Sequence, residues 1–137
     1  MHMQGTPQTM QNKPVYTDIV RELIIYFAER EAAARLHGIT DLIIDPGFGF
    51  GKTIRHNFQL LRELCLFNML GMPVMVGISR KSMIYKSLNN QPGDSLNGTT
   101  VLNTLALTNG ARILRVHDVK EASEAVKLFG IYQNSGD

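Results

Sequence analysis

The sequence predicts an α/β fold in which a parallel sheet is connected by crossover helices. Two observations indicate this class. Segments with helical periodicity alternate with short, continuous apolar runs, and each apolar run is followed directly by a cluster of glycine and polar residues. Such alternation is typical of βα units, because parallel strands need a long connection that is usually a helix.

The first predicted helix covers residues 14–36. Pro14 suits a first helical turn, and Gly38 follows the last turn, where glycine commonly ends a helix. Charged residues alternate with an apolar stripe, as expected for a helix that packs on a sheet. We assign this stripe to Ile19, Leu23, Tyr26 or Phe27, and Leu36.

Three apolar runs, over residues 41–45, 73–77 and 111–116, predict the strands. Each run is continuous and does not alternate with polar residues, and glycine, proline or polar residues bound it. A run of this kind favours a strand that is buried on both faces, as in a parallel sheet covered by helices.

Three further helical regions are predicted. The first covers residues 56–70 and the last covers 120–129. The middle region starts at about residue 81, is broken at 89–93 and resumes over 97–108. Gly71 ends the first of these. The buried face of the helix over residues 56–70 is assigned to four residues in helical register: Phe58, Leu61, Leu64 and Phe67.

Composition excludes several classes of protein. With 137 residues, 44% hydrophobic and 19% charged, the chain is long and apolar enough for one globular domain and unlike a disordered chain. A net charge of +2 is too mild to favour nucleic acid as a partner. No export signal precedes the domain, and no apolar run approaches the roughly 18 residues of a spanning helix, so we expect no membrane partner and a cytoplasmic location.

The single cysteine and the first residues carry two further expectations. Cys65 cannot form an internal disulfide and lies in an apolar stretch, which favours a buried core thiol. Residues 1–7 resemble a strand end followed by a strand-to-helix loop, without the strand itself. We therefore expect residues 1–137 to be a single domain that is a fragment of a longer protein.

The polar clusters that follow the apolar runs are the most informative feature. They cover residues 2–7, 45–52, 77–82 and 115–118. In parallel α/β folds, ligands bind at the carboxyl ends of the strands, where loops can vary on a rigid support. The sequence therefore predicts that all four clusters contribute to one site.

The glycine-rich cluster fits neither common nucleotide motif. A P-loop would need glycine at Pro46, and a dinucleotide fingerprint would need glycine at Ile54. A tight turn could let the backbone approach a flat ligand, on which Phe48 and Phe50 could stack. The alternative is a plain turn with one buried aromatic residue.

Asp45 ends a predicted buried strand, where a carboxylate needs partners. Its acceptor oxygens would suit the paired N–H groups of an amino-substituted heterocycle. The alternative is a carboxylate that caps the following turn.

Two clusters favour anions. Ser79, Arg80, Lys81 and Ser82 stand at a predicted helix N-terminus, which indicates an oxyanion or carboxylate site or, alternatively, a solvated basic surface. Arg115 and His117 have the spacing of two residues on one side of a strand, and together they suit a phosphate or pyrophosphate. The other three histidines, His2, His37 and His56, show no metal-ligand spacing, and surface or helix-end roles suffice for them.

Together, the four clusters closely resemble those of the bacterial dihydropteroate synthase family, in its order and approximate spacing and over nearly the whole chain. The resemblance implies a (β/α)₈ TIM barrel, of which this chain would be the C-terminal half, about (βα)₄. It implies a transferase of folate biosynthesis, a sulfonamide target, that joins dihydropterin methyl pyrophosphate to p-aminobenzoate and releases pyrophosphate. It also implies Mg²⁺ as a cofactor that assists the leaving group, with its protein ligand, an Asn, outside this chain.

The resemblance assigns roles by position. Asp45 would bind the amino-pyrimidine edge of the pterin, and Met1 and Gly77 would border its slot. Lys81 would bind the polar edge of the pterin and help to place the second substrate. Arg115 would lie across the pterin, and the resemblance makes Lys81 and Arg115 the catalytic residues.

The second substrate and the leaving group have their own residues in the resemblance. Phe50 would pack against the p-aminobenzoate ring, with Ser79 and Ser82 near its carboxylate. Arg115 and His117 would hold the pyrophosphate.

Two alternatives stay open: a pterin-binding domain of the methyltetrahydrofolate methyltransferase type, and a non-catalytic half-barrel that binds a partner through its sheet edges. The two anion-binding clusters favour the synthase, because methyl transfer releases no pyrophosphate. For the 137-residue chain on its own we expect little or no turnover. We also expect a homodimer or larger species, because unpaired strand edges recruit other strands.

Overall fold

The structure is a computed structural model that describes residues 1–6, 8 and 14–136. Two short strands, β1 (Met75–Val76) and β2 (Ile113–Leu114), pair in parallel, with Met75 opposite Ile113. Ile44 adds a single parallel bridge to Val74. The three predicted strand regions therefore lie side by side and run parallel, as expected, although the ladders are much shorter than the apolar runs.

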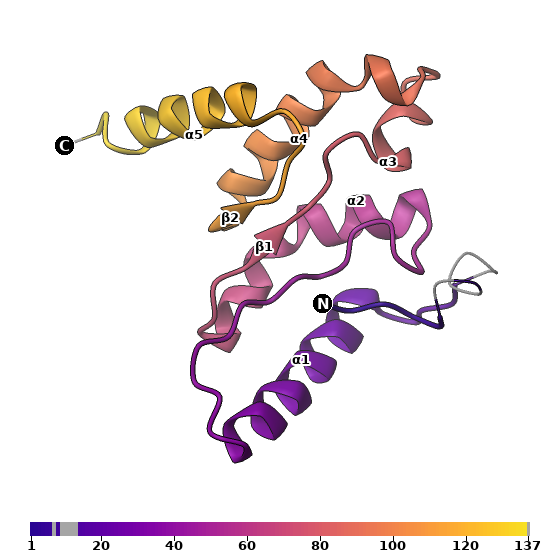
Figure 1. Ribbon diagram of the computed structural model, residues 1–137, viewed down its shortest axis with the longest axis vertical. Helices are drawn as coiled ribbons and strands as arrows, with labels where there is room; N and C mark the ends of the chain where they lie inside the picture. The colour runs from indigo at the N-terminus through magenta and orange to yellow at the C-terminus, as the bar shows by residue number, and fades with distance from the viewer. Residues whose placement is uncertain (7, 9–13, 137) are drawn as a thin grey trace.

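Helices flank this small sheet and supply most of the regular structure (Figure 1). α1 lies at one end of the molecule, α4 and α5 pack together at the other, and α2 lies between them. The helical elements are α1 (Ile19–Leu36), α2 (Ile54–Arg62), η1 (Leu64–Leu70), α3 (Ser82–Tyr85), η2 (Pro92–Asp94), α4 (Leu96–Thr108) and α5 (Val119–Gln133).

α1 begins at Ile19 and not at Pro14, because Asp18 is its N-cap and accepts the backbone N–H of Arg21 at 3.1 Å. The predicted end is confirmed by Gly38, whose φ of +76° lies in the left-handed region. The assignment of Leu36 to the buried stripe was wrong, since 87% of it is exposed in the last turn.

The predicted helix over residues 56–70 is two elements. A regular α-helix, α2, ends at Arg62, and the tighter 3₁₀ helix η1 follows. With about three residues per turn, η1 turns Leu64 and Phe67 inward and leaves Cys65 exposed. The prediction of a buried thiol was therefore wrong, and so was the buried position of Phe58, which is 37% exposed.

The apolar run over residues 41–45 is not buried on both faces. Ile44 is 2% exposed, whereas its neighbour Ile43 is 54% exposed. Successive side chains of extended backbone point to opposite faces, and here one face packs on the core while the other is open. The prediction was correct for one face only.

A single apolar core joins the sheet to α1, α2, η1 and α3. Its largest fully buried members are Ile19, Leu23, Ile44, Phe48, Leu60, Leu64, Phe67, Val74, Val76, Ile78 and Met83, and α4 adds Leu102 and Ala106 to the same core. Phe48 belongs to this core with 0% exposure, so it is not available to stack on a ligand. In the part of the chain that the structure describes, no helix has the length and apolarity needed to cross a bilayer.

Candidate functional site

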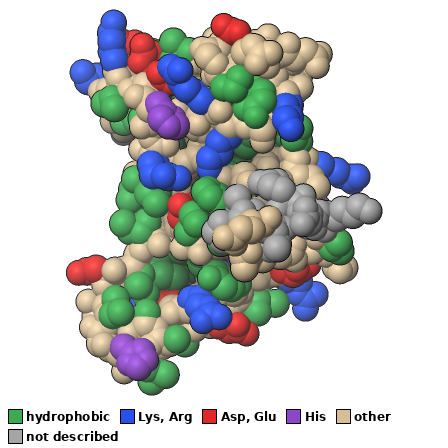
Figure 2. All heavy atoms as spheres, turned by 45° about the vertical axis from the view of Figure 1, so that its right-hand side comes forward, with side chains coloured by type: hydrophobic (Ala, Val, Ile, Leu, Met, Phe, Trp, Pro, Cys, Tyr) green, Lys and Arg blue, Asp and Glu red, His purple; other side chains and the backbone are tan. Residues whose placement is uncertain are grey.

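A small hollow of about 110 Å³ lies where β1 and β2 end, and we call it the strand-end hollow. Figure 2 shows several Lys and Arg side chains close together across the middle of one face of the molecule. The hollow is lined by residues from the two clusters that follow β1 and β2: Gly77, Ser79, Lys81, Arg115, Val116 and His117. Two of the four predicted clusters therefore lie around one hollow, and their role as a ligand site stays a prediction.

Arg115 lies directly over the backbone of Gly77. A Cβ atom at Gly77 would stand 3.1 Å from Nε of Arg115 and 3.2 Å from its Nη2. That separation is tighter than ordinary van der Waals contact, so the absence of a side chain at residue 77 leaves room for the guanidinium. Gly77 thus sets where the charge of Arg115 stands at the end of the sheet.

His117 is tied to Ser79 across the two strands. Its backbone N–H donates to Oγ of Ser79 at 3.2 Å, and its ring Nδ1 lies 3.1 Å from the same oxygen. Ser79 is 4% exposed. Its hydroxyl is therefore engaged with His117, and its predicted place beside a p-aminobenzoate carboxylate stays a prediction.

Lys81 connects the strand-end hollow to the cluster that follows Ile44. Its Nζ donates to the carbonyl oxygen of Phe48 and lies 4.7 Å from the ring centroid of Phe50. The pKa of Lys81 is lowered to about 8, first by burial and then by the nearby Arg115 charge, while the Asp45 carboxylate opposes the shift. Lys81 thus stands between Asp45, Phe50 and Arg115, three of the predicted site residues.

Asp45 is buried, as its predicted role requires, with 6% exposed. Its Oδ1 accepts the backbone N–H of Gly47 at 2.8 Å, which is the turn-capping bond of the alternative interpretation. Among the described residues, Oδ2 has no hydrogen-bond partner. One oxygen therefore shapes the turn, and the other can accept from a ligand.

Residues 46–51, which we call the glycine loop, are shaped by the chain itself. A Cβ at Gly47 would overlap the carbonyl oxygen of His2, and one at Gly51 would stand 2.6 Å from that of Gln4. Both glycines also have positive φ. The interpretation that glycine admits a flat ligand here was wrong for these two positions, which admit the N-terminal segment.

Two other predicted site residues stand at the edge of this arrangement. Ser82 is half-buried as the first residue of α3. Met1 is 54% exposed and lies beside Gly47, bordering a different hollow of about 280 Å³ next to α1.

Arg80 does not face the strand-end hollow. Its guanidinium makes a two-pronged ion pair with the carboxylate of Asp118, at 2.6 and 3.0 Å. These bonds raise the pKa of Arg80 and lower that of Asp118. Of the two cations predicted for an anion site, Lys81 lines the hollow and Arg80 links the β1 end to the N-terminus of α5.

Sequence reasoning missed two buried polar residues that organise the glycine loop. Asn57 on α2 accepts the N–H of Gly49 at 2.8 Å, and the ammonium of Lys52 lies among backbone carbonyls under the loop. Both are less than 5% exposed. The burial of Lys52 could not be predicted, because its sequence neighbours, Gly51 and the helix-capping Thr53, are typical of an exposed turn.

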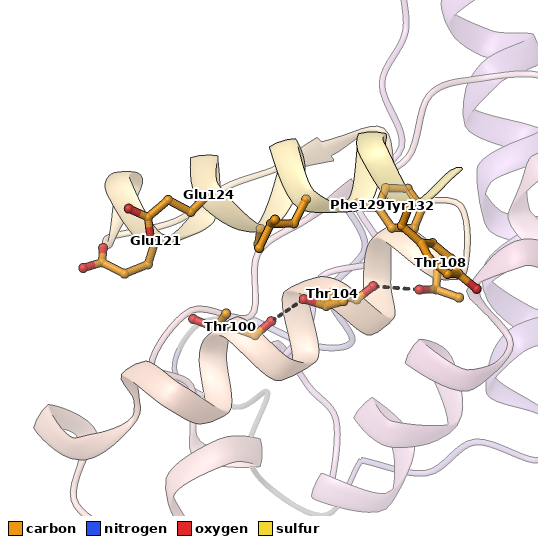
Figure 3. Close-up of a pocket in the computed structure, with 9 residues that line it drawn as sticks. Thr100, Thr104, Thr108, Glu121, Glu124, Phe129 and Tyr132 are labelled. Carbon is orange, nitrogen blue, oxygen red and sulfur yellow. Dashed lines mark hydrogen bonds between the residues drawn. The ribbon is translucent and has the colours of Figure 1, made fainter. Parts of the chain in front are cut away.

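A larger groove of about 590 Å³ runs between α4 and α5, away from the strand ends. Figure 3 shows Thr100, Thr104 and Thr108 along one side and Phe129 and Tyr132 on the other. The threonine hydroxyls bond back to carbonyls of their own helix at 2.9 to 3.2 Å. None of the predicted site residues lines this groove, so we place the candidate site at the strand ends despite its smaller volume.

Comparison with known proteins matches this arrangement to one family. The family model described as pterin binding enzyme covers residues 1–117, which include every predicted site residue. The chain belongs to the pterin-binding enzyme family. The resemblance derived from the four motif clusters is confirmed.

The most similar relatives of this pterin-binding chain include dihydropteroate synthases. That of Escherichia coli strain K12 is 47% identical over 130 residues, which are 93% of this chain and 46% of the relative. The Yersinia pestis enzyme, solved with a sulfonamide drug, has a TM-score of 0.95 and 39% identity over 98% of this chain and 50% of that one. The Xanthomonas albilineans enzyme, solved with 7,8-dihydropteroate, has a TM-score of 0.85 and 40% identity over 88% of this chain and 49% of that one.

These relatives favour the synthase over the methyltransferase and the non-catalytic module. The chain spans about half the length of the curated relatives it matches.

Proposed function

We propose that this chain supplies the pterin and pyrophosphate contacts of a dihydropteroate synthase. In that reaction the amine nitrogen of p-aminobenzoate forms a bond to the methylene carbon of dihydropterin methyl pyrophosphate. The bond from this carbon to the pyrophosphate oxygen breaks, pyrophosphate leaves with the electron pair, and the amine loses a proton. The proposal makes the protein a transferase of folate biosynthesis.

One observation carries the proposal: Arg115, His117 and Lys81 line a single hollow next to the loop that bears Asp45. An Arg fork and an imidazole side by side suit the charge that develops on a departing pyrophosphate. The Asp45 carboxylate interacts electrostatically with Lys81, and its Oδ2 is available to accept from the amino-pyrimidine edge of a pterin. Phe50 offers its ring beside Lys81 for the aromatic second substrate.

Magnesium belongs to this proposal only through the family resemblance. Within residues 1–6, 8 and 14–136, no three His, Cys, Asp or Glu side chains lie close enough together to hold a metal ion. The described residues therefore do not fit a metal site of their own. We derive no step through Mg²⁺ and assign the charge stabilisation of this chain to Arg115, His117 and Lys81.

The finer parts of the proposal follow from the relatives. The parallel strand regions and flanking helices would form about (βα)₄ of a (β/α)₈ barrel, supported by the TM-score of 0.95 to the Yersinia pestis enzyme. The sulfonamide bound to that enzyme supports sulfonamide binding here, beside Phe50 and Lys81. A cytoplasmic location and a homodimer complete the proposal.

The test is a two-substrate assay on the protein that carries this sequence. Pyrophosphate release is followed by a coupled assay, and dihydropteroate is identified by mass spectrometry. We expect release to require both the pterin pyrophosphate and p-aminobenzoate, and the 137-residue chain alone to bind ligand with turnover near background. Pyrophosphate release without p-aminobenzoate, or no binding of pterin by any form of the protein, would contradict the proposal.

A further inference from the structure

Lys52 is a buried cation that has no carboxylate in hydrogen-bond contact among the residues that the structure describes. It follows the glycine loop directly, yet only 4% of it is exposed. Its Nζ donates to the carbonyl oxygens of Phe50 at 2.9 Å and Gly47 at 3.0 Å, and it lies 3.1 Å from Nδ1 of His2. A longer contact of 3.4 Å reaches the carbonyl oxygen of His2.

These contacts match the donor capacity of an ammonium group, which has three N–H bonds. The ring of His2 can act as the third acceptor because it is neutral. Burial lowers the pKa of His2 to about 4, with the Lys52 charge as the next cause. His2 therefore offers a lone pair to Lys52 at neutral pH.

Lys52 joins two segments that are far apart in the sequence. The backbone N–H of His2 donates to the carbonyl of Asp45 at 3.0 Å, so the N-terminal segment lies along the start of the loop. The carbonyl of Gly47 accepts both from Lys52 and from the N–H of Phe50, at 3.0 and 3.1 Å. The Lys52 ammonium thus holds the turn that places Phe50, and it also fixes this turn to His2.

The two lysines bond different carbonyls of one loop. Lys81 bonds the carbonyl of Phe48, lies over the Phe50 ring and lines the strand-end hollow. Lys52 bonds the carbonyls of Gly47 and Phe50, and it does not line the strand-end hollow. Lys81 has a predicted role toward substrates, whereas nothing in the site uses Lys52.

We propose that Lys52 is a positioning residue, which holds the glycine loop so that the Asp45 carboxylate and the Phe50 ring stand correctly for ligands. The inference deepens the proposed function and rests on it for the identity of the ligand. Removal of the ammonium takes the Lys52 donor from the carbonyl oxygen of Phe50 and leaves that of Gly47 with the N–H of Phe50 alone. A buried carbonyl that loses its donor favours rearrangement of the loop.

Deprotonation should have a similar effect to substitution. The pKa of Lys52 is lowered to about 8, chiefly by burial, with Asp45 opposing the shift and the Lys81 charge adding to it. As the pH rises through that value, Nζ loses its charge and one of its three donors, and the loop loosens. The titratable groups that face Lys52 or the loop from neighbouring segments are His2, Tyr16, Asp45, His56 and Lys81.

The first experiment compares two ligands in three variants. Binding of 6-hydroxymethylpterin and of sulfate is measured by calorimetry in Lys52→Met, Lys52→Arg and the control Lys127→Met, which removes an exposed lysine on α5. We expect Lys52→Met to weaken pterin binding about tenfold, the effect of one unsatisfied buried group. Sulfate binding, which depends on Arg115 and His117, should change by less than about twofold. Lys52→Arg should recover pterin affinity at least in part, and Lys127→Met should match the wild type.

Equal loss of both ligands, or unchanged pterin affinity in Lys52→Met, would overturn the inference. If the Lys52→Met variant does not fold, the inference is tested by a pH titration of Lys52 in a protein that keeps this lysine. In a Lys81→Met background, the ¹³Cε signal of Lys52 and the amide signals of residues 47–51 are followed by NMR from pH 6 to pH 10, a range set around the ordinary and lowered lysine pKa values.

We expect the amide signals of residues 47–51 to shift with the same pH midpoint as the Lys52 signal. Amide signals that do not follow the Lys52 titration would overturn the inference. The titration needs no pterin. A chain that fails to bind pterin but shows the coupled titration contradicts the proposed function and leaves the role of Lys52 in the loop standing.

Discussion

The ring Nδ1 of His117 and the backbone N–H of His117 both contact one atom, Oγ of Ser79, at 3.1 and 3.2 Å. Ser79 follows β1 and His117 follows β2, so this hydroxyl joins the two clusters in addition to the strand pairing. Ser79 is buried and His117 is exposed, so the hydroxyl anchors an exposed ring to the buried end of β1. The orientation of the imidazole is thereby set by a residue of the neighbouring strand end.

Ser79→Ala should weaken anion binding without unfolding the chain. The substitution removes two hydrogen bonds that hold His117, each worth about 1 kcal/mol, so sulfate affinity should fall by up to about thirtyfold. Calorimetric titration with sulfate measures the loss, and Ser123→Ala on the exposed face of α5 is the matched control. Sulfate affinity equal to that of the wild type would show that the Ser79 contact does not position His117.

Arg115→Ala should lower synthase turnover sharply. The guanidinium over Gly77 is the cation best placed to stabilise the departing pyrophosphate, and loss of one such group typically lowers the rate on the order of 100-fold. Steady-state pyrophosphate release in the protein that carries this sequence provides the measurement. Arg112→Ala removes an exposed arginine three residues away and should leave turnover unchanged; turnover at the wild-type level in Arg115→Ala would remove Arg115 from the mechanism.

Asp45→Asn should separate the two roles of this carboxylate. Asn keeps an Oδ1 that can accept the N–H of Gly47, so the turn and the melting temperature should be nearly unchanged. At the ligand side, an amide NH₂ replaces an acceptor oxygen and faces the N–H groups of the pterin edge. Pterin affinity should fall about tenfold or more by calorimetry, whereas Asp41→Asn, at an exposed position, should have no effect. Unchanged pterin affinity in Asp45→Asn would leave the residue as a turn cap alone.

The parts of the site that the sequence predicted well are those fixed by strand ends. The spacing of Arg115 and His117 placed both on one side of β2, and the parallel arrangement placed them beside Lys81, as the strand-end hollow shows. These relations depend on the two-residue period of a strand and on strand direction, which the apolar runs reveal.

The parts that the sequence could not predict depend on contacts between distant segments. Nothing in the local pattern indicates that Gly47 faces His2, that Arg80 pairs with Asp118, or that Lys52 is buried. Cys65 was misassigned because a 3₁₀ helix has a different period from an α-helix, and an apolar stretch fits both. The errors therefore concern side-chain partners and local helix type, and they leave the order of the elements intact.

Anion binding should weaken as the pH rises from 7 to 9. Below its lowered pKa of about 8, Lys81 is a cation at the strand-end hollow, and above that value it is neutral. Sulfate is a suitable probe because its own charge is constant over this range. We expect its affinity in the wild type to fall through pH 8, and Lys81→Arg, which keeps its charge, to give a flat profile. A fall of the same size in Lys81→Arg would assign the titration to another group.

The chain should associate in solution, and the structure offers two apolar surfaces for this. One is the open face of residues 42–44, where Ile43 is 54% exposed and the neighbouring Ile44 forms only the bridge to Val74. An edge paired this little fits the expectation that unpaired strand edges recruit other strands. The other lies on α5, where Leu128, Ile131 and Tyr132 are 67%, 69% and 71% exposed. Leu128 and Tyr132 also line the groove between α4 and α5, in which Figure 3 shows Tyr132. Three large apolar side chains on one regular helix form a wider contact than one isoleucine on an irregular segment, so we expect α5 to contribute more.

Analytical ultracentrifugation of the 137-residue chain tests this expectation. The wild type should sediment as a dimer or larger species, Leu128→Lys should shift it toward monomer, and Ile43→Lys should have a smaller effect. Val15→Lys, a substitution of another apolar residue that is 74% exposed, controls for the added charge. A larger shift with Ile43→Lys would assign the contact to the open sheet edge, and a wild type that stays monomeric at every concentration would contradict the proposed homodimer.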